Sequence, residues 1–124
     1  MNKLEAIERV NKRLGKPALT DKNTHFANIV LYGTDEGWWL KIPYLTFKKE
    51  LHFILNNEKG KSFQHLTINA NQILSPGMKF RSSEGAADAF IPSANPKRLI
   101  DALDGGSKYN FTRHVVNEYR HQDR

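Results

Sequence analysis

Two histidines near the middle of the chain have the spacing of residues that face each other in a β-hairpin. The segments KELHFILN (49–56) and KSFQHLTIN (61–69) flank a turn, NEKG. If Asn56 faces Lys61, His52 lies opposite His65 on one face of the sheet, with Glu50 two residues away. Two imidazoles beside a carboxylate could act as an acid–base pair or bind a metal. His52 and His65 are therefore the catalytic candidates; an exposed cross-strand pair without chemistry is the alternative.

The segment GWWLKIPY (37–44) contains the second candidate site, because two tryptophans are adjacent in it. In a β-strand, neighbouring side chains face opposite ways, so Trp38 is expected in the core together with Leu40. Trp39 would then share the other face with Lys41, which places a flat ring beside a cation, as in a base-stacking platform. The alternative is that a helix covers this face and buries Trp39.

Basic residues near this segment and further along the chain extend the candidate site. A nucleic-acid interface needs such cations to converge, because each phosphate contact adds only modestly to the affinity. We expect Lys97 and Arg98 in the first turn of a helix that follows Asn95-Pro96, where free backbone N–H groups suit an anion; two solvated surface charges are the alternative. The predicted nucleic-acid-binding residues are Trp39, Lys41, Tyr44, Lys48, Lys79, Arg81, Lys97 and Arg98.

Several kinds of chemistry find no support in the sequence. The chain has no cysteine, which excludes disulfides, thiolate zinc sites and cysteine nucleophiles. Neither a phosphate-cradling glycine motif nor a serine in a nucleophile elbow occurs. His114 and Glu118 have ligand spacing only if the C-terminus is helical. No third metal ligand is evident beside the histidine pair, so neither a metal nor a cofactor is predicted, and enzymatic activity stays open.

The elements that would position these residues can be read from periodicity and turn signals. Residues 2–14 predict a helix that is capped by Asn2, carries an apolar stripe of Leu4, Ile7, Val10 and Leu14, and stops at Gly15 and Pro17. Residues 26–90 alternate as strands, with hairpins across TDEG and NEKG. Helices are expected from Asn95-Pro96 to Leu103 and, against a strand alternative, in residues 107–124.

The sum is a single α+β domain spanning 1–124. We expect a mostly antiparallel sheet of about five strands, with an N-terminal helix and one or two C-terminal helices. Its 124 residues suit one domain of ordinary size, and the net charge of +6 favours a polyanionic partner. No stretch is apolar enough for a signal peptide or a membrane span, so a cytoplasmic protein without membrane partners is expected.

Three functions from different classes fit these observations. The first is a small basic domain that binds nucleic acid, DNA or RNA, through an aromatic and basic sheet face. The second is an interaction or inhibitor module, such as one from a defence or mobile-element system, which presents its aromatic residues to an acidic protein. The third is a small metal-independent nuclease that uses His52 and His65.

Overall fold

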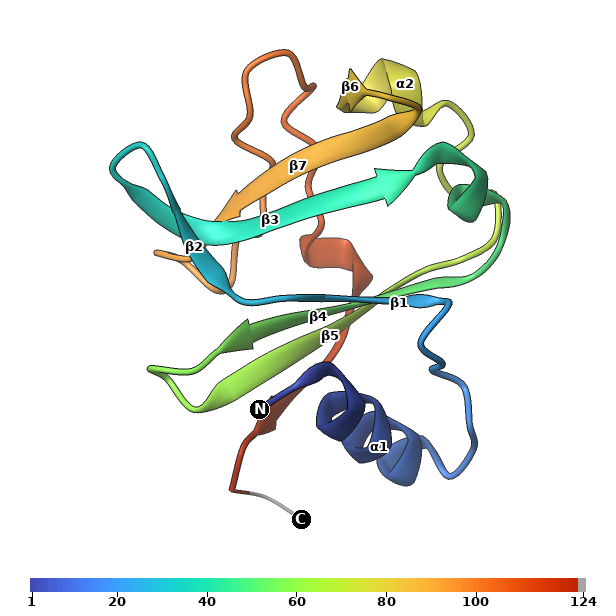
Figure 1. Ribbon diagram of the computed structural model, residues 1–124, viewed down its shortest axis with the longest axis vertical. Coiled ribbons are helices and arrows are strands. Elements are labelled where there is room, and N and C mark those ends of the chain that lie inside the picture. The colour runs from blue at the N-terminus through green and yellow to red at the C-terminus, as the bar shows by residue number, and fades with distance from the viewer. Residues whose placement is uncertain (123–124) are drawn as a thin grey trace.

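Two four-stranded β-sheets pack face to face, and one helix covers the outer face of one of them (Figure 1). The computed structural model describes residues 1–122. The elements are α1 (Lys3–Leu14), β1 (Thr24–Ala27), β2 (Ile29–Tyr32), β3 (Asp35–Pro43), the 3-10 helix η1 (Tyr44–Lys48), β4 (Leu51–Asn57), β5 (Ser62–Ile68), α2 (Pro76–Lys79), β6 (Arg81–Ser83), β7 (Ala86–Pro92), η2 (Thr112–His114) and β8 (Val115–Arg120).

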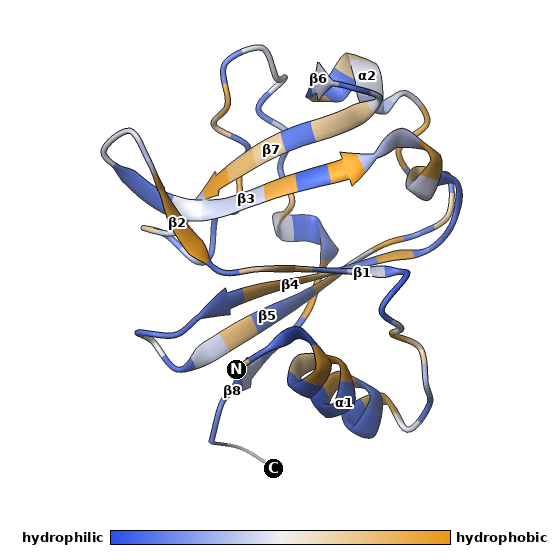
Figure 2. Cartoon of the chain, in the orientation of Figure 1, coloured by the Kyte–Doolittle hydropathy of each residue, from blue (hydrophilic) through white to orange (hydrophobic). Residues whose placement is uncertain are grey.

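The strand order is β1-β4-β5-β8 in the first sheet and β2-β3-β7-β6 in the second. Among the strands of residues 1–122, only the β1–β4 pair is parallel; the other strand pairs are antiparallel. The α+β class is therefore confirmed, but the described chain has eight strands in two sheets where the sequence predicted about five in one. The two sheets enclose the main hydrophobic core. Figure 2 shows hydrophobic and hydrophilic residues alternating along β3, as expected for a strand with one buried face.

The N-terminal helix forms as predicted. The side chain of Asn2 accepts a hydrogen bond of 2.9 Å from the backbone N–H of Glu5, which satisfies one of the free donors at the helix start. Gly15 ends the helix in the left-handed region, with a φ of 72°, and its N–H donates to the carbonyl of Asn11. A residue without Cβ adopts this conformation at little cost.

The buried face of α1 differs from the predicted stripe. Ala6, Ile7 and Val10 are buried against the first sheet, whereas Leu4 and Leu14 are exposed. Together with Leu19, the buried residues pack on the side chains that the outer face of this sheet presents, which are Ile54, Phe63 and Tyr119. The helix is thus rotated so that its small residue, Ala6, allows close approach to the sheet.

The β4–β5 hairpin across NEKG is confirmed, with a register that differs from the expected one. Asn57 pairs with Ser62, and Phe53 pairs with Leu66. The expected pairing of Asn56 with Lys61 is therefore wrong by two positions, because the four-residue turn is formed by residues 58–61 and not by residues 57–60, so that Asn56 pairs with Phe63. A shift of two preserves the face of every side chain. Leu51, Phe53, Leu66 and Ile68 are accordingly buried on one face, as predicted.

The first arm of the hairpin predicted across TDEG, residues 26–32, is divided between the two sheets. It breaks at Asn28, so that β1 pairs with β4 in the first sheet while β2 pairs with β3 in the second. The β2–β3 turn contains Gly33, which has a φ of 62°. A strand that changes sheets at a break connects the two layers of a sandwich without a long loop.

The two predicted C-terminal helices are absent from the described residues. Residues 95–103 form turns and extended chain, because Leu99 is buried in the core and Ala102 donates its N–H to the carbonyl of Phe90 at the edge of β7. The final segment forms β8, in which Tyr119 stacks on Phe63 with ring centroids 4.8 Å apart. Here strand pairing overrides the weak helical pattern. No helix of residues 1–122 is long and apolar enough to cross a membrane.

Candidate functional site

The adjacent tryptophans lie on opposite faces of the second sheet. Trp38 is 2% exposed between the sheets, and its indole Nε1 donates a hydrogen bond of 2.8 Å to the carbonyl of Asn56. Trp39 points to the outer face and is half-buried. The prediction that Trp38 belongs to the core is confirmed. Helix α1 lies on the other sheet, so it does not cover Trp39 (Figure 1).

Trp39 belongs to a cluster of three aromatic rings on this outer face. Its ring centroid lies 5.5 Å from that of Tyr32 and 6.3 Å from that of Phe90. Phe90, the cross-strand partner of Trp39, is buried, while Tyr32 stays 39% exposed. Contacts with these two rings restrict the orientation of the Trp39 ring, which stays partly accessible.

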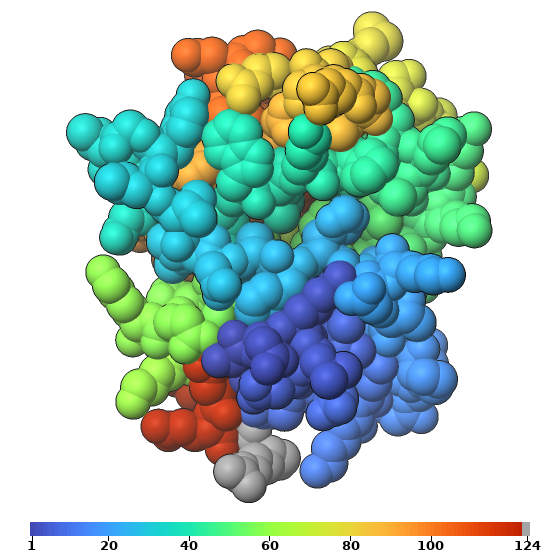
Figure 3. Space-filling view, viewed as in Figure 1, coloured from blue at the N-terminus to red at the C-terminus, as the bar shows by residue number. Residues whose placement is uncertain are grey.

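Cations reach the same face from two strands. The register aligns Lys41 of β3, Asp88 of β7 and Arg81 of β6 in one row, beside the pair Trp39–Phe90. The guanidinium carbon of Arg81 lies 5.5 Å from the centre of the Trp39 ring, a cation–π contact. In Figure 3, residues of β3 (teal) and of the β6–β7 turn (gold) lie side by side on the surface. The structure thus brings together three of the predicted residues: Trp39, Lys41 and Arg81. These three residues, with Tyr32, are called the platform below.

Two carboxylates, from Glu84 and Asp88, partly neutralise the positive charge of the platform. The ammonium of Lys41 lies 3.7 Å from a carboxylate oxygen of Glu84, and both side chains are more than half exposed. Asp88 is buried and accepts a hydrogen bond of 2.6 Å from the hydroxyl of Ser83. The two cations of the platform, Lys41 and Arg81, are balanced by the two neighbouring carboxylates. The aromatic surface is therefore expected to contribute more to binding than the net charge of the platform.

The other predicted basic residues lie elsewhere. Tyr44, Lys48 and Lys79 belong to one end of the sandwich, where the hydroxyl of Tyr44 contacts that of Ser82. The helix expected to begin near Asn95 does not form, so Lys97 and Arg98 are exposed residues of a turn in which Arg98 N–H donates to the carbonyl of Asn95. The anion site at a helix N-terminus is therefore contradicted.

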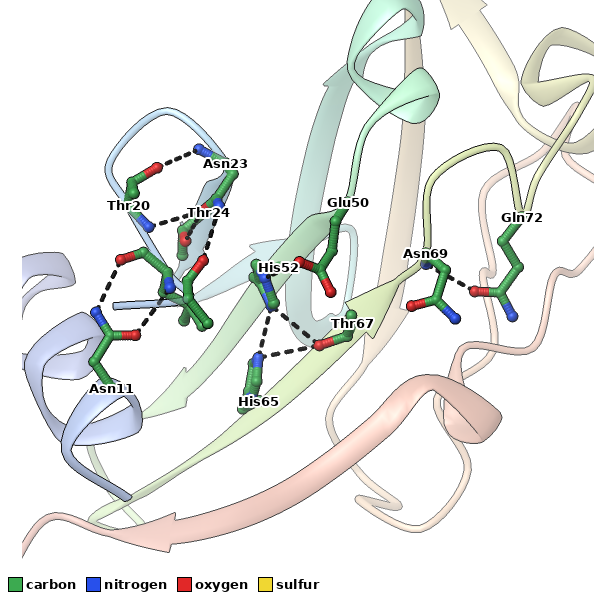
Figure 4. Close-up of polar contacts among 12 residues, drawn as sticks. Asn11, Thr20, Asn23, Thr24, Glu50, His52, His65, Thr67, Asn69 and Gln72 are labelled. Carbon is green, nitrogen blue, oxygen red and sulfur yellow. Dashed lines mark hydrogen bonds and ion pairs between the residues drawn. The ribbon is translucent and has the colours of Figure 1, made fainter. Parts of the chain in front are cut away.

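His52 and His65 share one sheet face, as predicted, but they are diagonal neighbours and are not exposed. His52 pairs with Thr67, and His65 pairs with Ile54. The two imidazoles are 3% and 1% exposed, and His52 Nδ1 lies 2.9 Å from His65 Nε2 (Figure 4). The hydroxyl of Thr67 is within 3.0 Å of the first nitrogen and 3.2 Å of the second. The expectation of an exposed pair is wrong, because both rings are almost fully removed from solvent.

The surroundings of the histidine pair determine its protons. Burial lowers the pKa of His52, and burial together with the charge of His52 lowers the pKa of His65 to about 4. Both rings are therefore neutral at pH 7. Donation from His65 Nε2–H to His52 Nδ1 leaves the other His52 proton on Nε2, which faces a carboxylate oxygen of Glu50 at 3.6 Å. The opposite assignment would direct a bare nitrogen at that carboxylate and bury an unpaired N–H at His65 Nδ1.

A second histidine contact was not found from the sequence. The hydroxyl of Tyr109 donates to His114 Nε2 over 2.6 Å and accepts from the guanidinium of Arg113 over 2.7 Å. Burial, with Arg113 as the second cause, lowers the pKa of His114. Tyr109 and His114 are both buried, and the ring of Tyr109 packs on Phe111. The contact therefore satisfies the polar atoms of two buried side chains at the edge of the core, where Arg113 binds the hydroxyl of Tyr109. Glu118 lies in β8, so the condition for ligand spacing with His114, a helical C-terminus, is not met.

A buried carboxyl also escaped prediction. Asp101 is 1% exposed, and its Oδ1 accepts hydrogen bonds from the backbone N–H groups of Phe90 and Leu103. Burial raises its pKa, although these two bonds act in the opposite direction. Asp101 thereby binds the backbone N–H of Phe90 in the part of β7 that extends past its pairing with β6. This role is structural. The polar residue in an otherwise apolar stretch, LIDAL, is the signal that could have found it.

Residues 1–122 contain no group of three or more potential metal ligands close enough to hold an ion. A cavity of about 560 Å³ lies between the sheets at the NEKG end, where Lys59 bridges to Glu36 at 3.7 Å. None of the predicted site residues lines it.

The sequence matches no known family model, and neither the curated proteins nor the solved structures contain a significant match.

Proposed function

We propose that the protein binds single-stranded nucleic acid on the platform, mainly by stacking bases on Trp39. The observation that carries this proposal is the convergence of Trp39, Lys41 and Arg81 on a sheet face that α1 does not cover. An accessible ring offers a π-surface to any base, and adjacent cations attract the phosphates. A guanidinium next to the ring extends the stacking surface, because its plane also stacks on bases.

The charge of the platform defines the kind of binding. Glu84 partly neutralises Lys41, and Asp88 stands between the two cations in the same row. Few phosphates are then neutralised, so the affinity is expected to depend only weakly on salt. The rest of the net charge of +6 contributes to attraction at longer range.

The nuclease alternative loses its geometric basis, since a catalytic group must come within hydrogen-bond reach of the substrate. His52 and His65 are both buried, and His52 Nδ1 and His65 Nε2 face each other and the hydroxyl of Thr67. Glu50 is about half exposed, and the cavity that it lines contains two lysines, Lys22 and Lys49, but no second acid–base group. We therefore retain the binding function alone for this part of the molecule.

The test is a fluorescence titration of labelled oligo-dT and oligo-rU at about 50 and 200 mM salt, the range over which phosphate contacts change affinity. Lys41→Ala should flatten the salt dependence, and Glu84→Gln should raise the affinity by unmasking Lys41. Lys59→Ala is the matched control, because Lys59 and Lys41 each face a glutamate at 3.7 Å but lie on different surfaces. Absence of binding at the lower salt concentration, or equal effects of both lysine substitutions, would overturn the proposal.

A further inference from the structure

Three protruding apolar side chains gather at the end of the sandwich that carries η1 and α2. Leu45 of η1 is 74% exposed, Leu74 in the loop after β5 is 81% exposed, and Met78 of α2 is 82% exposed. These are the three most exposed large apolar residues of the described chain. Together they form what is called the end surface below. An exposed apolar cluster of this kind is typical of an interaction site.

The segments that carry these residues are held together by the fold. The N–H of Asn71 donates to the carbonyl of Phe47 over 2.9 Å, which fixes the loop after β5 to η1. Gly77 of α2 lies against the ring of Tyr44. Figure 1 shows η1, this loop and α2 on the same side of the molecule. The end surface is therefore a fixed feature built by two separate parts of the chain: η1, and the loop after β5 together with the α2 helix that follows it.

A groove runs between Leu45 and Leu74. It has a volume of about 300 Å³, and Phe47 and Ile73, which are 2% and 5% exposed, belong to its lining. A second cavity of about 330 Å³ lies on the other side of Leu45. Apolar walls over a buried apolar floor suit the insertion of one large apolar side chain from a partner.

The charged residues around the end surface are mostly positive. Lys48 lines the first groove, Lys22 and Lys49 line the second, and Lys79 follows Met78 in α2. Within residues 1–122 none of these four lysines forms an ion pair. Glu50 is the one carboxylate among the lining residues of the two cavities. The apolar cluster is thus surrounded by cations that lack a counter-charge.

We propose that the end surface binds an acidic segment of a partner protein that inserts an apolar side chain between Leu45 and Leu74. Carboxylates of such a segment would supply the counter-charges that Lys48 and Lys49 lack. A second copy of this chain fits poorly, because it would bring like charges together. Nucleic acid would satisfy the lysines but would leave the protruding leucines and the methionine without a role.

The experiment compares two acidic polymers as probes: polyglutamate, which offers charge alone, and a random copolymer of glutamate and tyrosine, which adds apolar anchors. The full chain should bind the copolymer about tenfold more tightly than polyglutamate, the effect of burying one apolar side chain. Leu45→Ser combined with Leu74→Ser should abolish that difference. Lys48→Ala combined with Lys49→Ala should weaken the binding of both polymers.

Two controls separate this surface from the rest of the molecule. Leu31→Ser removes another leucine of similar exposure, 70%, from β2 and should leave the preference for the copolymer unchanged. Trp39→Ala should also leave it unchanged, so the result does not depend on the platform. Equal affinity for both polymers, or a preference that survives the double leucine substitution, would overturn the proposal. Binding to phosphatidylglycerol vesicles in place of the copolymer, with the same dependence on the leucines, would overturn it in favour of a lipid surface.

Discussion

His52 Nδ1 and His65 Nε2 lie 2.9 Å apart in a buried position on adjacent strands, β4 and β5. Two neutral imidazoles can share a proton at this distance, whereas two charged ones would repel each other without water to screen them. The stability of the folded state therefore depends on pH through this pair.

We expect stability to fall as the pH decreases from 6.5 to about 4, the unfolded and folded pKa values of His65. Within this window the unfolded chain binds a proton that the folded chain excludes, so stability rises with pH; below it, this contribution is fully lost. The difference in pKa corresponds to about 3 kcal/mol. Urea unfolding at several pH values measures it, and His65→Gln should show a shallower pH dependence than the native chain. An unchanged slope in this variant would assign the acid sensitivity to other groups.

Two buried tyrosines should respond in opposite ways to removal of the hydroxyl. Tyr109 OH contacts His114 and Arg113 at 2.6 and 2.7 Å, whereas the hydroxyl of Tyr119 has no hydrogen-bond partner among the described residues. Tyr109→Phe should lower the free energy of unfolding by about 1–2 kcal/mol, because it leaves buried groups unpaired. Tyr119→Phe should be neutral or stabilising. Thermal melts compare the two, and an equal loss in both variants would contradict the described contacts.

Local periodicity could predict the elements whose stability is local. Asn2 and Gly15 define α1 through their own backbone and side-chain bonds, and the alternation around NEKG defines a hairpin between adjacent segments. The same alternation placed Trp38 and Trp39 on opposite faces. These inferences depend on contacts within a few residues or across one turn, which the sequence displays directly.

The elements that were missed depend on distant contacts. Ala102 pairs with Phe90 at an edge of β7, and Tyr119 stacks on Phe63; both contacts replace a helix that the local pattern favoured. The break at Asn28 could not be predicted either, because it reflects the existence of a second sheet. At the candidate site, the sequence identified Trp39, Lys41 and Arg81 but offered no means to exclude Lys97, since convergence is a property of the tertiary fold.

Gly37, directly before the tryptophans, should tolerate no side chain. A Cβ at this position would lie 2.3 Å from the carbonyl oxygen of Ile91 and 2.7 Å from the ring of Phe90. Gly37→Ala should therefore displace β3 from β7 and destabilise the fold by about 1–3 kcal/mol or more. Gly77→Ala is the control, because its Cβ would meet Tyr44 at an ordinary distance of 3.5 Å. Equal melting temperatures for the two variants would show that β3 and β7 are less closely packed than described.

The two tryptophans should separate stability from binding. Trp38→Ala empties a core site and leaves the carbonyl of Asn56 without its donor, so it should cost roughly 3–5 kcal/mol. Trp39→Ala should cost about 1–2 kcal/mol, because the ring is only half removed from water. The same substitution should weaken single-stranded nucleic-acid binding by ~1–3 kcal/mol, the value of one stacked base.

Fluorescence can assign the binding effect to Trp39 directly. The chain contains two tryptophans, so Trp38→Phe leaves Trp39 as the only indole while it keeps most of the core volume. Addition of oligo-dT to this variant should quench the remaining emission, because a base would stack on the ring that emits. Thermal melts of Trp38→Ala and Trp39→Ala complete the comparison. If both substitutions lower the melting temperature equally and oligo-dT leaves the emission unchanged, Trp39 is a packing residue, and the acidic protein partner of the end surface becomes the leading function.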